Sequence, residues 1–575
     1  MILPLTTESV QQPKLNYQLQ EALLAPSCTP THTRRSSPQD TIRSRSGPPP
    51  LGMKDRRRER LKALGKVIYN GAAGKMVASK KYGQFFTPES VASTLVKWAV
   101  SGPQDHILDP ACGNGEFLWH HRFSVGVEID PVHATIARER AATSPVYQQD
   151  FFSWAEQTEE RFDAVVGNPP FIRYHGFTGE TRTRALRLAL RIGAKLPQLT
   201  SSWAPFLAVA AGLLKPGGRM AFVVPAEIGH AKYAVPLLWG LARSFSKVQV
   251  IAVKHKMFPR LSEDAWLLYT EGFGGKTDHL DFTVREEFFP WENVPKVSAK
   301  VSLDALKAAN GRLRRWILPT RVLSAYEELE GAEDMRRLGS VAEVGIGYVT
   351  GANAFFHLRP SEARTLEIPP SFLKVSVRKG EYLPVTGRLM PSLVERWLAG
   401  DEPVLLLHIE KSSKLPLSVE KYLSTERAKE AQKAFKCAVR NPWYVVPNVT
   451  VPHGFLSYMS GSEPRLVENS SRCVATNSVH TVRLKDKIRF GLLQEQWQSP
   501  VTRLSCEIEG HPLGGGMLKL EPGEAKRVLL PDHAENSGNG DERVRPLMEQ
   551  GIEIMHGWRH YNKTVEGGRA VKRGD

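Results

Sequence analysis

The chain has 575 residues, 41% of them hydrophobic, and a formal net charge of +17. The length is too great for one hydrophobic core and predicts several domains. The positive charge favours a polyanionic partner such as nucleic acid, with a merely soluble basic protein as the alternative. The longest apolar run, residues 204–214, is too short to span a bilayer and predicts a buried helix, so we expect no membrane partner.

The five cysteines lie far apart, and no two of them have CxxC spacing. This pattern argues against a disulfide framework and against a zinc site, so we expect no metal. It is typical of a protein that works in a reducing compartment.

Residues 1–60 are rich in Pro, Ser and Arg and have no hydrophobic periodicity. We expect a disordered basic tail here. Two alternatives stay open: a transit peptide, and a start of translation at Met53.

Residues 61–325 alternate short apolar runs with helical patterns, which indicates βαβ units around a mostly parallel sheet. A helix is expected to begin with Thr87 as its N-cap and Pro88 in its first position. The expected strands are residues 106–109, 124–130, 146–150, 162–168 and 219–225.

The stretch DPACGNGEF follows the first expected strand. Gly113 and Gly115 permit a tight turn and close approach of a ligand to the backbone. Glu128 ends the second strand, where a carboxylate commonly binds ribose hydroxyls. Together they favour a cofactor that contains a nucleoside.

The glycine turn matches neither GxGxxG nor GxxxxGK[ST], the two patterns that bind phosphates. A cofactor without phosphate, such as S-adenosylmethionine, fits better. Asp150 would then accept a hydrogen bond from the adenine amino group, with Phe151 packing on the ring. A helix cap is the alternative role for Asp150.

The stretch GNPPF directly follows the strand-like run FDAVV. Asn168, Pro169 and Pro170 form a stiff, extended corner, because proline fixes φ and restricts the residue before it. Phe171 places an aromatic ring beside the fixed acceptors. This arrangement suits a planar group that carries an NH2.

Six segments appear in a fixed order: TP at 87–88, DPACGNGEFL, GVEIDP, QDFF, GNPPF and LKPGGRMAFVVP. Over residues 82–265 the chain closely resembles the gamma-class adenine-N6 DNA methyltransferases of restriction-modification systems, the NPPF type with a C-terminal target-recognition domain. The resemblance implies a Rossmann-like class I methyltransferase domain of the α/β class. It also implies S-adenosylmethionine as cofactor and methyl transfer to the N6 amino group of an adenine flipped out of duplex DNA.

The resemblance also assigns roles to individual residues. The cofactor-binding residues would be Thr87, Asp109, Ala111, Gly113, Glu128, Asp150 and Phe151. The residues around the target base would be Asn168, Pro169, Pro170 and Phe171. Phe258 would be a second stacking ring, although a core position explains it equally well.

Beyond residue 330 the pattern becomes irregular and predicts a mixed α+β domain. We place a target-recognition domain at residues 326–535, followed by an extension at 536–575 without an assigned role. Four segments resemble blocks of such a domain: VGIGYVTGANAFFHL at 344–358, NPWYVVPNV at 441–449, ENSSRCVATNSVHTV at 468–482 and GHPLGGGMLKLEP at 510–522.

The expected partner is double-stranded DNA in the cytoplasm of a bacterial or archaeal cell, near the nucleoid. No nuclease motif is evident, so any restriction endonuclease would be encoded separately. Arg184, Arg187 and Arg191 recur at helical spacing and are candidates for a phosphate-facing stripe or for a solvated face. The alternative functions are a methyltransferase for RNA adenine or protein glutamine, and a non-catalytic specificity subunit.

Overall fold

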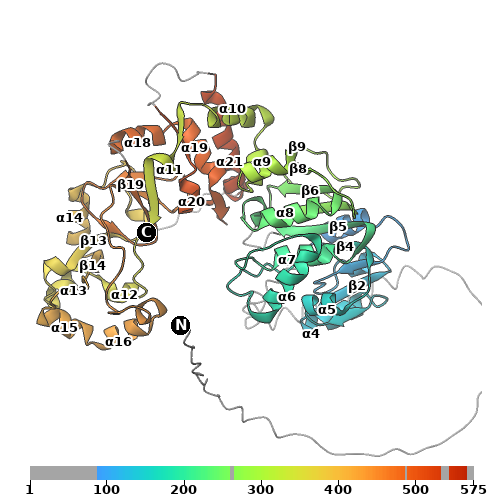
Figure 1. The fold of residues 1–575 in the computed structure, drawn as a ribbon, viewed down its shortest axis with the longest axis horizontal. Coiled ribbons are helices and arrows are strands. Elements are labelled where there is room, and N and C mark those ends of the chain that lie inside the picture. The colour runs from blue at the N-terminus through green and yellow to red at the C-terminus, as the bar shows by residue number, and fades with distance from the viewer. Residues whose placement is uncertain (1–86, 259–263, 486–488, 514, 533–542, 566–575) are drawn as a thin grey trace, which may run out of the picture. The chain divides into compact units, whose positions relative to one another are not determined.

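The computed structural model describes residues 87–258, 264–485, 489–513, 515–532 and 543–565 (Figure 1). The expected disordered tail at 1–60 lies outside the described residues. Within these ranges the strands form one large sheet from residues 107–302 and four small sheets from residues 335–531.

The large sheet has nine strands in the order β3-β2-β1-β4-β5-β7-β6-β8-β9. Neighbours from β3 to β5 are parallel, β7 runs antiparallel between β5 and β6, and β9 is an antiparallel edge strand. This confirms the mostly parallel α/β class I fold. The strands are β1 (Ile107–Asp109), β2 (Ser124–Glu128), β3 (Val146–Gln148), β4 (Phe162–Gly167), β5 (Leu214–Pro225), β6 (Phe245–Val253), β7 (Ala265–Phe273), β8 (His279–Arg285) and β9 (Ala299–Ser302).

Both faces of this sheet are buried, which explains the continuous apolar runs of its strands. Along β4, Val165 belongs to one core cluster, whereas Ala164 and Val166 belong to another, because alternate side chains point to opposite faces. Helices α7 and α8 pack on one face and α3 on the other. The helices of this half are α3 (Glu89–Ala99), α4 (Pro131–Arg140), α5 (Phe151–Gln157), α6 (Gly179–Ala189), α7 (Trp203–Ala211), α8 (Ala234–Ala242), α9 (Leu303–Ala308) and α10 (Thr320–Glu330).

The expected start of the first helix is wrong by one residue. Helix α3 begins at Glu89, and Pro88 is its N-cap with extended backbone angles, φ −58° and ψ 140°. The Pro88 carbonyl accepts the first helical hydrogen bonds, from the amides of Val91 and Ala92 at 3.0 Å each. Thr87 therefore lies outside the helix, and its hydroxyl does not cap it.

The second half is a mixed α+β arrangement, as expected. Its sheets have the orders β10-β22, β11-β19-β15-β17, β12-β14-β13-β18 and β16-β21-β20. The strands are β10 (Met335–Arg337), β11 (Ala342–Ile346), β12 (His357–Leu358), β13 (Leu373–Val377), β14 (Leu405–Leu407), β15 (Gly454–Ser457), β16 (Met459–Ser460), β17 (Leu466–Glu468), β18 (Val474–Ala475), β19 (Val479–Leu484), β20 (His511–Leu513), β21 (Met517–Lys519) and β22 (Leu529–Pro531). The helices are α11 (Leu338–Val341), α12 (Asn353–Phe356), α13 (Pro360–Thr365), α14 (Pro391–Ala399), α15 (Leu417–Leu423), α16 (Glu426–Lys433), α17 (Phe435–Ala438), α18 (Phe490–Trp497), α19 (Pro500–Glu509), α20 (Pro522–Ala525) and α21 (Arg545–Val565).

Helix α21 lies in the extension to which the sequence assigned no role. It packs against α19 and α10, and Met548, Ile552 and Met555 join the core cluster that includes α7 and α8. Near its end, the Tyr561 hydroxyl donates to Asp264 at 2.6 Å. The extension is therefore an integral part of the fold.

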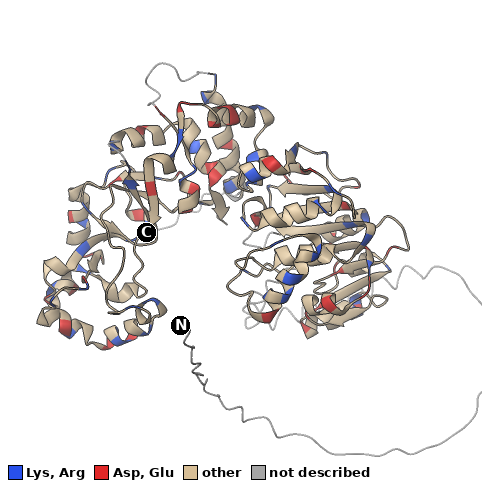
Figure 2. Ribbon diagram, in the orientation of Figure 1, with Lys and Arg blue, Asp and Glu red and all other residues tan. Residues whose placement is uncertain are grey.

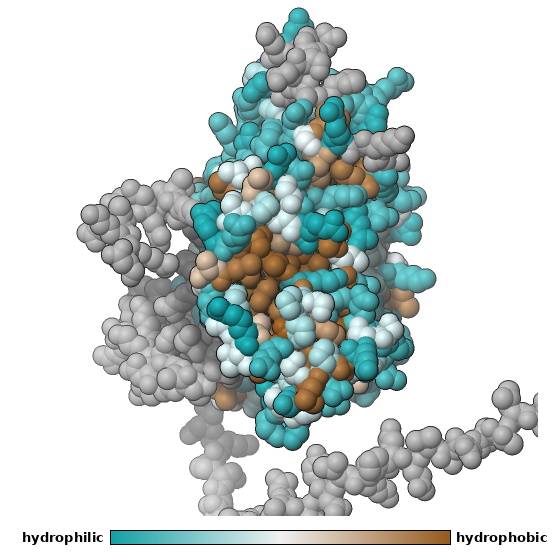
Figure 3. Space-filling view, turned by 90° about the vertical axis from the view of Figure 1, so that its left-hand side faces the viewer, coloured by the Kyte–Doolittle hydropathy of each residue, from teal (hydrophilic) through white to brown (hydrophobic). Residues whose placement is uncertain are grey.

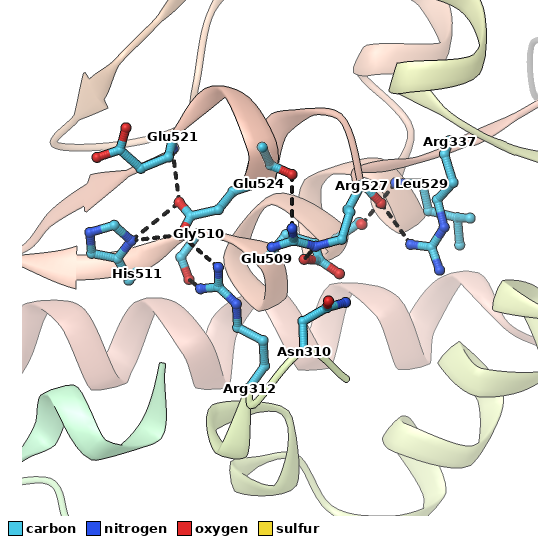
Figure 4. Close-up of polar contacts among 12 residues, drawn as sticks. Asn310, Arg312, Arg337, Glu509, Gly510, His511, Glu521, Glu524, Arg527 and Leu529 are labelled. Atoms are coloured by element: carbon cyan, nitrogen blue, oxygen red, sulfur yellow. Dashed lines mark hydrogen bonds and ion pairs between the residues drawn. The ribbon is translucent and has the colours of Figure 1, made fainter. Parts of the chain in front are cut away.

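A buried polar junction links the 3-10 turn η4 (Leu313–Ile317) to α19 and α20 (Figure 4). Arg312, directly before η4, donates from Nη2 to Glu524 Oε1 at 2.6 Å. His511 Nδ1 lies 3.0 Å from the same oxygen, and the Glu521 amide donates to Glu524 Oε2 at 2.8 Å. Both oxygens of the Glu524 carboxylate are thus engaged.

The charges of the chain are spread over many elements. Figure 2 shows Lys and Arg interspersed with Asp and Glu along both halves. The face of the second half shown in Figure 3 is mostly hydrophilic around a central apolar area. None of the helices in the described ranges combines the length and the apolar composition that crossing a bilayer requires. The described cysteines, Cys112, Cys437, Cys473 and Cys506, are buried and free.

Candidate functional site

The predicted site residues gather at the carboxyl edge of the parallel strands. In the sheet, β1 lies between β2 and β4, so the chain reverses its direction of strand addition next to β1. In open α/β sheets, ligands bind outside the strand ends at this kind of switch point. Asp109 ends β1, Glu128 ends β2, and Asn168 directly follows β4.

The Asp109 carboxylate is buried and only partly satisfied. Its Oδ1 accepts a hydrogen bond from the Ala111 amide at 3.1 Å, whereas Oδ2 has no partner among the described residues. Burial raises the pKa of Asp109 to about 8; the Ala111 hydrogen bond lowers it in part, and the negative charge of Glu128 raises it further. A buried acceptor without a donor costs stability, so it marks a place where a ligand can supply one.

The glycine turn is bonded to Glu128. The Gly113 amide donates to Glu128 Oε2 at 2.9 Å, and the Asp130 amide donates to Oε1 at 2.8 Å. Gly113 has φ +52° with nothing within 4 Å of an added Cβ, so backbone conformation rather than space favours glycine there. Burial raises the pKa of Glu128, although these two backbone hydrogen bonds oppose the shift.

Asp150 and Phe151 both have structural partners. Asp150 is the N-cap of α5, because its Oδ1 accepts from the Ser153 amide at 2.9 Å and from the Ser153 hydroxyl at 3.1 Å. The Phe151 ring is buried and stacks on Phe206, with 4.9 Å between centroids. The helix-cap alternative for Asp150 is confirmed, and the adenine-binding roles of both residues stay predictions.

The Asn168 corner is fixed from two sides. The Asn168 amide donates from Nδ2 to Thr87 Oγ1 at 3.2 Å, and Thr87 is buried. On the other side, the Ser202 hydroxyl donates to the Pro170 carbonyl and accepts from the Ile172 amide. Ser202 is absent from the sequence-based site; it is the N-cap residue of α7, but its side chain makes no capping hydrogen bond.

Gly167 connects the Asp109 and Asn168 positions. A Cβ added to Gly167 would lie 3.0 Å from Asp109 Oδ1 and 3.1 Å from the Phe222 ring. The Asp109 carboxylate therefore packs against the end of β4, directly before Asn168. The structure thus brings together four of the predicted residues: Thr87 and Asn168 through a hydrogen bond, Asp109 through Gly167, and Ala111 through Asp109.

The two aromatic residues predicted at the target base differ in exposure. Phe171 is half-buried and packs against the core clusters on both faces of the sheet. Phe258 is 6% exposed, within the cluster on the α3 face. This position agrees with the alternative of a core phenylalanine, and its stacking role stays a prediction.

The arginines at helical spacing do not form a free phosphate-facing stripe. Arg184 donates from Nε to Glu156 at 2.8 Å, and Arg187 forms an ion pair with the same carboxylate. Arg191 donates to the Ala155 carbonyl at 3.2 Å. All three therefore bind the neighbouring helix α5, because Glu156 supplies a nearby counter-charge that the helical spacing alone did not predict.

Three family models match the chain. N-6 DNA Methylase matches residues 67–133, Eco57I restriction-modification methylase matches residues 123–238, and the C-terminal domain of Type II methyltransferase M.Eco57I matches residues 310–558. The two matches in the first half include Asp109, Gly113, Glu128 and Asn168.

Several known proteins are similar to this chain. Type II methyltransferase M.AccI of Acinetobacter calcoaceticus is 21% identical over 474 residues, which cover 79% of this chain and 86% of that protein. Type II methyltransferase M.XamI of Xanthomonas campestris pv. amaranthicola is 23% identical over 474 residues, covering 78% and 85%. A tRNA1(Val) (adenine(37)-N6)-methyltransferase of Salmonella enteritidis is 30% identical over 162 residues, covering 26% and 62%.

Among solved structures, the type IIG restriction endonuclease BpuSI aligns with a TM-score of 0.41 at 14% identity, over 86% of this chain and 63% of that one. The DrdV–DNA complex aligns with a TM-score of 0.48 at 11% identity, over 88% of this chain and 60% of that one. This chain thus spans less than two thirds of either. The family matches in both halves and the two relatives aligned over most of the sequence support an N6-adenine methyltransferase of a restriction-modification system with a C-terminal domain.

Proposed function

We propose that this chain is a site-specific DNA methyltransferase that transfers a methyl group from S-adenosylmethionine to the exocyclic N6 of a flipped adenine. One observation carries the proposal: the Asn168–Phe171 corner follows β4 at the switch point and packs beside the partly unsatisfied carboxylate of Asp109. A corner with fixed acceptors and a buried carboxylate with a free oxygen provide two adjoining half-sites, one for an amine and one for a cofactor.

The residues at the strand ends fit S-adenosylmethionine. Asp109 Oδ2, which has no donor among the described residues, would accept from the amino-acid end, with Ala111 and Gly113 lining it. Glu128 would hold the ribose hydroxyls, and the backbone hydrogen bonds from Gly113 and Asp130 fix its carboxylate at the end of β2. When bound, the cofactor supplies an electrophilic methyl group on a positively charged sulfur.

The Asn168 corner would activate the target amine. Its Nδ2 donates to Thr87 at 3.2 Å, which helps to fix the side chain, and its side-chain oxygen would accept one amino hydrogen. The Pro169 carbonyl would accept the second hydrogen, which lets the adenine nitrogen pyramidalise as it attacks the methyl group. Ser202 fixes the Pro170 carbonyl, so these acceptors are preorganised and need not reorient during the reaction.

Duplex DNA is the substrate that the second half of the chain supports best. The match of residues 310–558 to a Type II methyltransferase C-terminal domain favours DNA over RNA or a glutamine side chain. The predicted division at residue 325 falls inside α10, so we propose that the recognition domain begins near residue 310 instead. A DNA substrate also implies a cytoplasmic location beside the chromosome, and any endonuclease partner would be a separate chain.

The test is transfer of labelled methyl groups from S-adenosylmethionine to plasmid DNA, followed by nucleoside analysis. The wild type should form N6-methyladenine, and Asn168→Ala should be slower by at least about 10²-fold, the usual effect of removing one oriented catalytic contact. Calorimetry should show that Asn168→Ala still binds the cofactor. Asn293→Ala, at an exposed asparagine in the same half, is the matched control and should keep full activity.

Two outcomes would contradict the proposal. Methylation of RNA or of a glutamine-bearing protein, with no label in DNA, would replace the substrate and keep the fold. Wild-type activity in Asn168→Ala would remove this asparagine from the catalytic site.

A further inference from the structure

The short helix α17 exposes two large apolar side chains on one side. Phe435 is 73% exposed and Val439 is 65% exposed, and residues four apart lie on the same helical side. Single exposed apolar residues are common and need no explanation. Here, however, the two neighbours are held by a buried support and lie in a segment rich in Lys and Arg, with Lys436 beside Phe435.

The support is the segment 349–351, part of the first recognition block. Cys437 is fully buried, and its thiol donates to the Thr350 carbonyl at 3.4 Å. Arg440 donates to the carbonyls of Val349 and Thr350 at 2.5 and 2.6 Å. A Cβ added to Gly351 would lie 2.7 Å from Lys436 Cβ, so the two segments are in direct contact. Helix α17 is therefore mounted rigidly with its apolar side outward.

The second recognition block braces the same region. Trp443, in NPWYVVPNV, is partly buried, with its ring 5.4 Å from Phe355 and 6.3 Å from Phe356. The aromatic rings of both blocks thus pack against one another. The exposed ring of this region, Phe435, lies between the two blocks in the sequence and belongs to neither.

The exposed pair lies in a positively charged segment of the sequence. Residues 411–440 contain eight Lys or Arg against three Glu and no Asp. On α16, Glu426 and Glu430 form ion pairs with Lys429 and Lys433 at 2.5 and 2.7 Å, and these two pairs carry no net charge, so the excess comes from the other residues of the segment. Lys436 Nζ lies 5.7 Å from the centroid of the Phe435 ring, so a cation is placed directly beside the apolar tip.

An apolar tip beside cations matches the chemistry of DNA. The phosphates attract lysine, and the faces and edges of the bases accept an aromatic or aliphatic side chain as a stacking partner or wedge. A protein partner would also bury Phe435, but the excess of positive charge favours a polyanion. We infer that α17 is a DNA contact in which Phe435 and Val439 pack against bases and Lys436 contacts a phosphate. The inference rests on the proposed function, because it requires DNA to be the substrate.

The experiment measures the affinity of the full chain for short sheared genomic duplexes by fluorescence anisotropy over a series of salt concentrations. Phe435→Ala should weaken binding by about tenfold at every salt concentration, since it removes a stacking contact and no charge. Lys436→Ala should reduce the salt slope by about 1, as expected for one phosphate contact. Phe435→Trp should retain affinity, and Phe289→Ala, at a phenylalanine of the first half that is 65% exposed, should equal the wild type.

The possible failures are distinguishable. Equal affinity of the wild type and the Phe435→Ala/Val439→Ala double variant would overturn this inference and leave DNA methylation standing. Absence of DNA binding by the wild type would overturn both. A change in oligomeric state of Phe435→Ala with unchanged DNA affinity would reassign the surface to contact between copies of this chain.

Discussion

Two buried carboxylates in different halves of the molecule have pKa values shifted in opposite directions. Asp109, at the edge of the large sheet, is 1% exposed, and its pKa is raised to about 8. Glu524, in the junction beside η4, is 7% exposed, and its pKa is lowered to about 2. The two have similar burial, so burial alone does not decide the direction of the shift.

The difference lies in their partners. Burial raises the pKa of both groups, but Glu524 accepts from His511 and Arg312, which together outweigh the burial. Among the residues that the structure describes, Asp109 has only the Ala111 amide as a donor, and it has a negatively charged neighbour in Glu128. A fully bonded buried carboxylate is typical of a structural junction, whereas one with an empty acceptor is typical of a ligand site.

The largest expected change in stability comes from the buried junction between Arg312 and Glu524. Glu524→Gln should lower the free energy of unfolding by about 3–5 kcal/mol at neutral pH, because it leaves Arg312 buried without its counter-charge. Urea unfolding at equilibrium measures this. The matched control is Glu430→Gln, in an exposed pair with Lys433, which should change stability by less than about 1 kcal/mol.

The same variant has a defined pH dependence. Because the pKa of Glu524 falls from 4.5 to about 2 on folding, its contribution is present above about pH 4.5 and is lost as the pH decreases toward 2. The gap in stability between wild type and Glu524→Gln should narrow over that interval. A gap that stays constant with pH would show that lost packing, not charge, causes the destabilisation.

Asp109→Asn should raise the free energy of unfolding, whereas Glu524→Gln lowers it. The pKa of Asp109 rises from 3.8 to about 8 on folding, so its contribution to stability is greatest below pH 3.8 and is lost as the pH rises through 8. Without cofactor, Asp109→Asn should therefore be more stable than the wild type above pH 8, by roughly 1–3 kcal/mol, the cost of an unsatisfied buried group.

The higher stability of Asp109→Asn should be accompanied by weaker binding of S-adenosylmethionine. Thermal unfolding across this pH range and calorimetry with S-adenosylmethionine measure the two effects. Unchanged cofactor affinity in Asp109→Asn would remove Asp109 from the cofactor site. A less stable variant at every pH would show that the carboxylate has a donor in the folded protein.

Much of the first half, from the strands of the sheet to the motifs at their ends, could be predicted from the sequence. Strands β1 to β5 follow from their apolar runs, because a parallel sheet buried on both faces has no polar alternation. Strands β6 to β9 were not among the expected strands. The fold class, the family resemblance and S-adenosylmethionine as cofactor were also predictable and are confirmed. They depend on short motifs at strand ends, which can be read locally in the sequence.

Contacts between distant segments were not predictable. The sequence placed Thr87 in a helix cap, whereas its hydroxyl meets Asn168, 81 positions away. Ser202 and α21 were missed because their partners, Pro170 and α19, are recognised only once the chain has folded. Asp150 is a case where a local contact was predictable. Its carboxylate accepts a hydrogen bond from the nearby Ser153 amide, and the same ability to accept a hydrogen bond suggested that it binds adenine.

The smallest expected effect is on the rate of methyl transfer, when the hydrogen bond that supports Asn168 is removed. Thr87→Val removes the acceptor of the Asn168 amide while keeping the shape of the side chain. One neutral hydrogen bond contributes about 0.5–1.5 kcal/mol, so kcat for methyl transfer should fall by about three- to tenfold. Thr87→Ser keeps the hydroxyl and should restore most of the rate.

Steady-state kinetics with S-adenosylmethionine and plasmid DNA distinguish two roles for Thr87. A lower kcat with an unchanged KM for the cofactor means that Thr87 orients Asn168, because the loss then falls on the reacting complex rather than on cofactor binding. A raised KM for the cofactor with an unchanged kcat would instead assign Thr87 to the cofactor, as the family resemblance implies. Thr87→Ser keeps the hydroxyl and loses only the methyl group. If Thr87→Ser were as slow as Thr87→Val, packing around α3 rather than the hydrogen bond would be the cause.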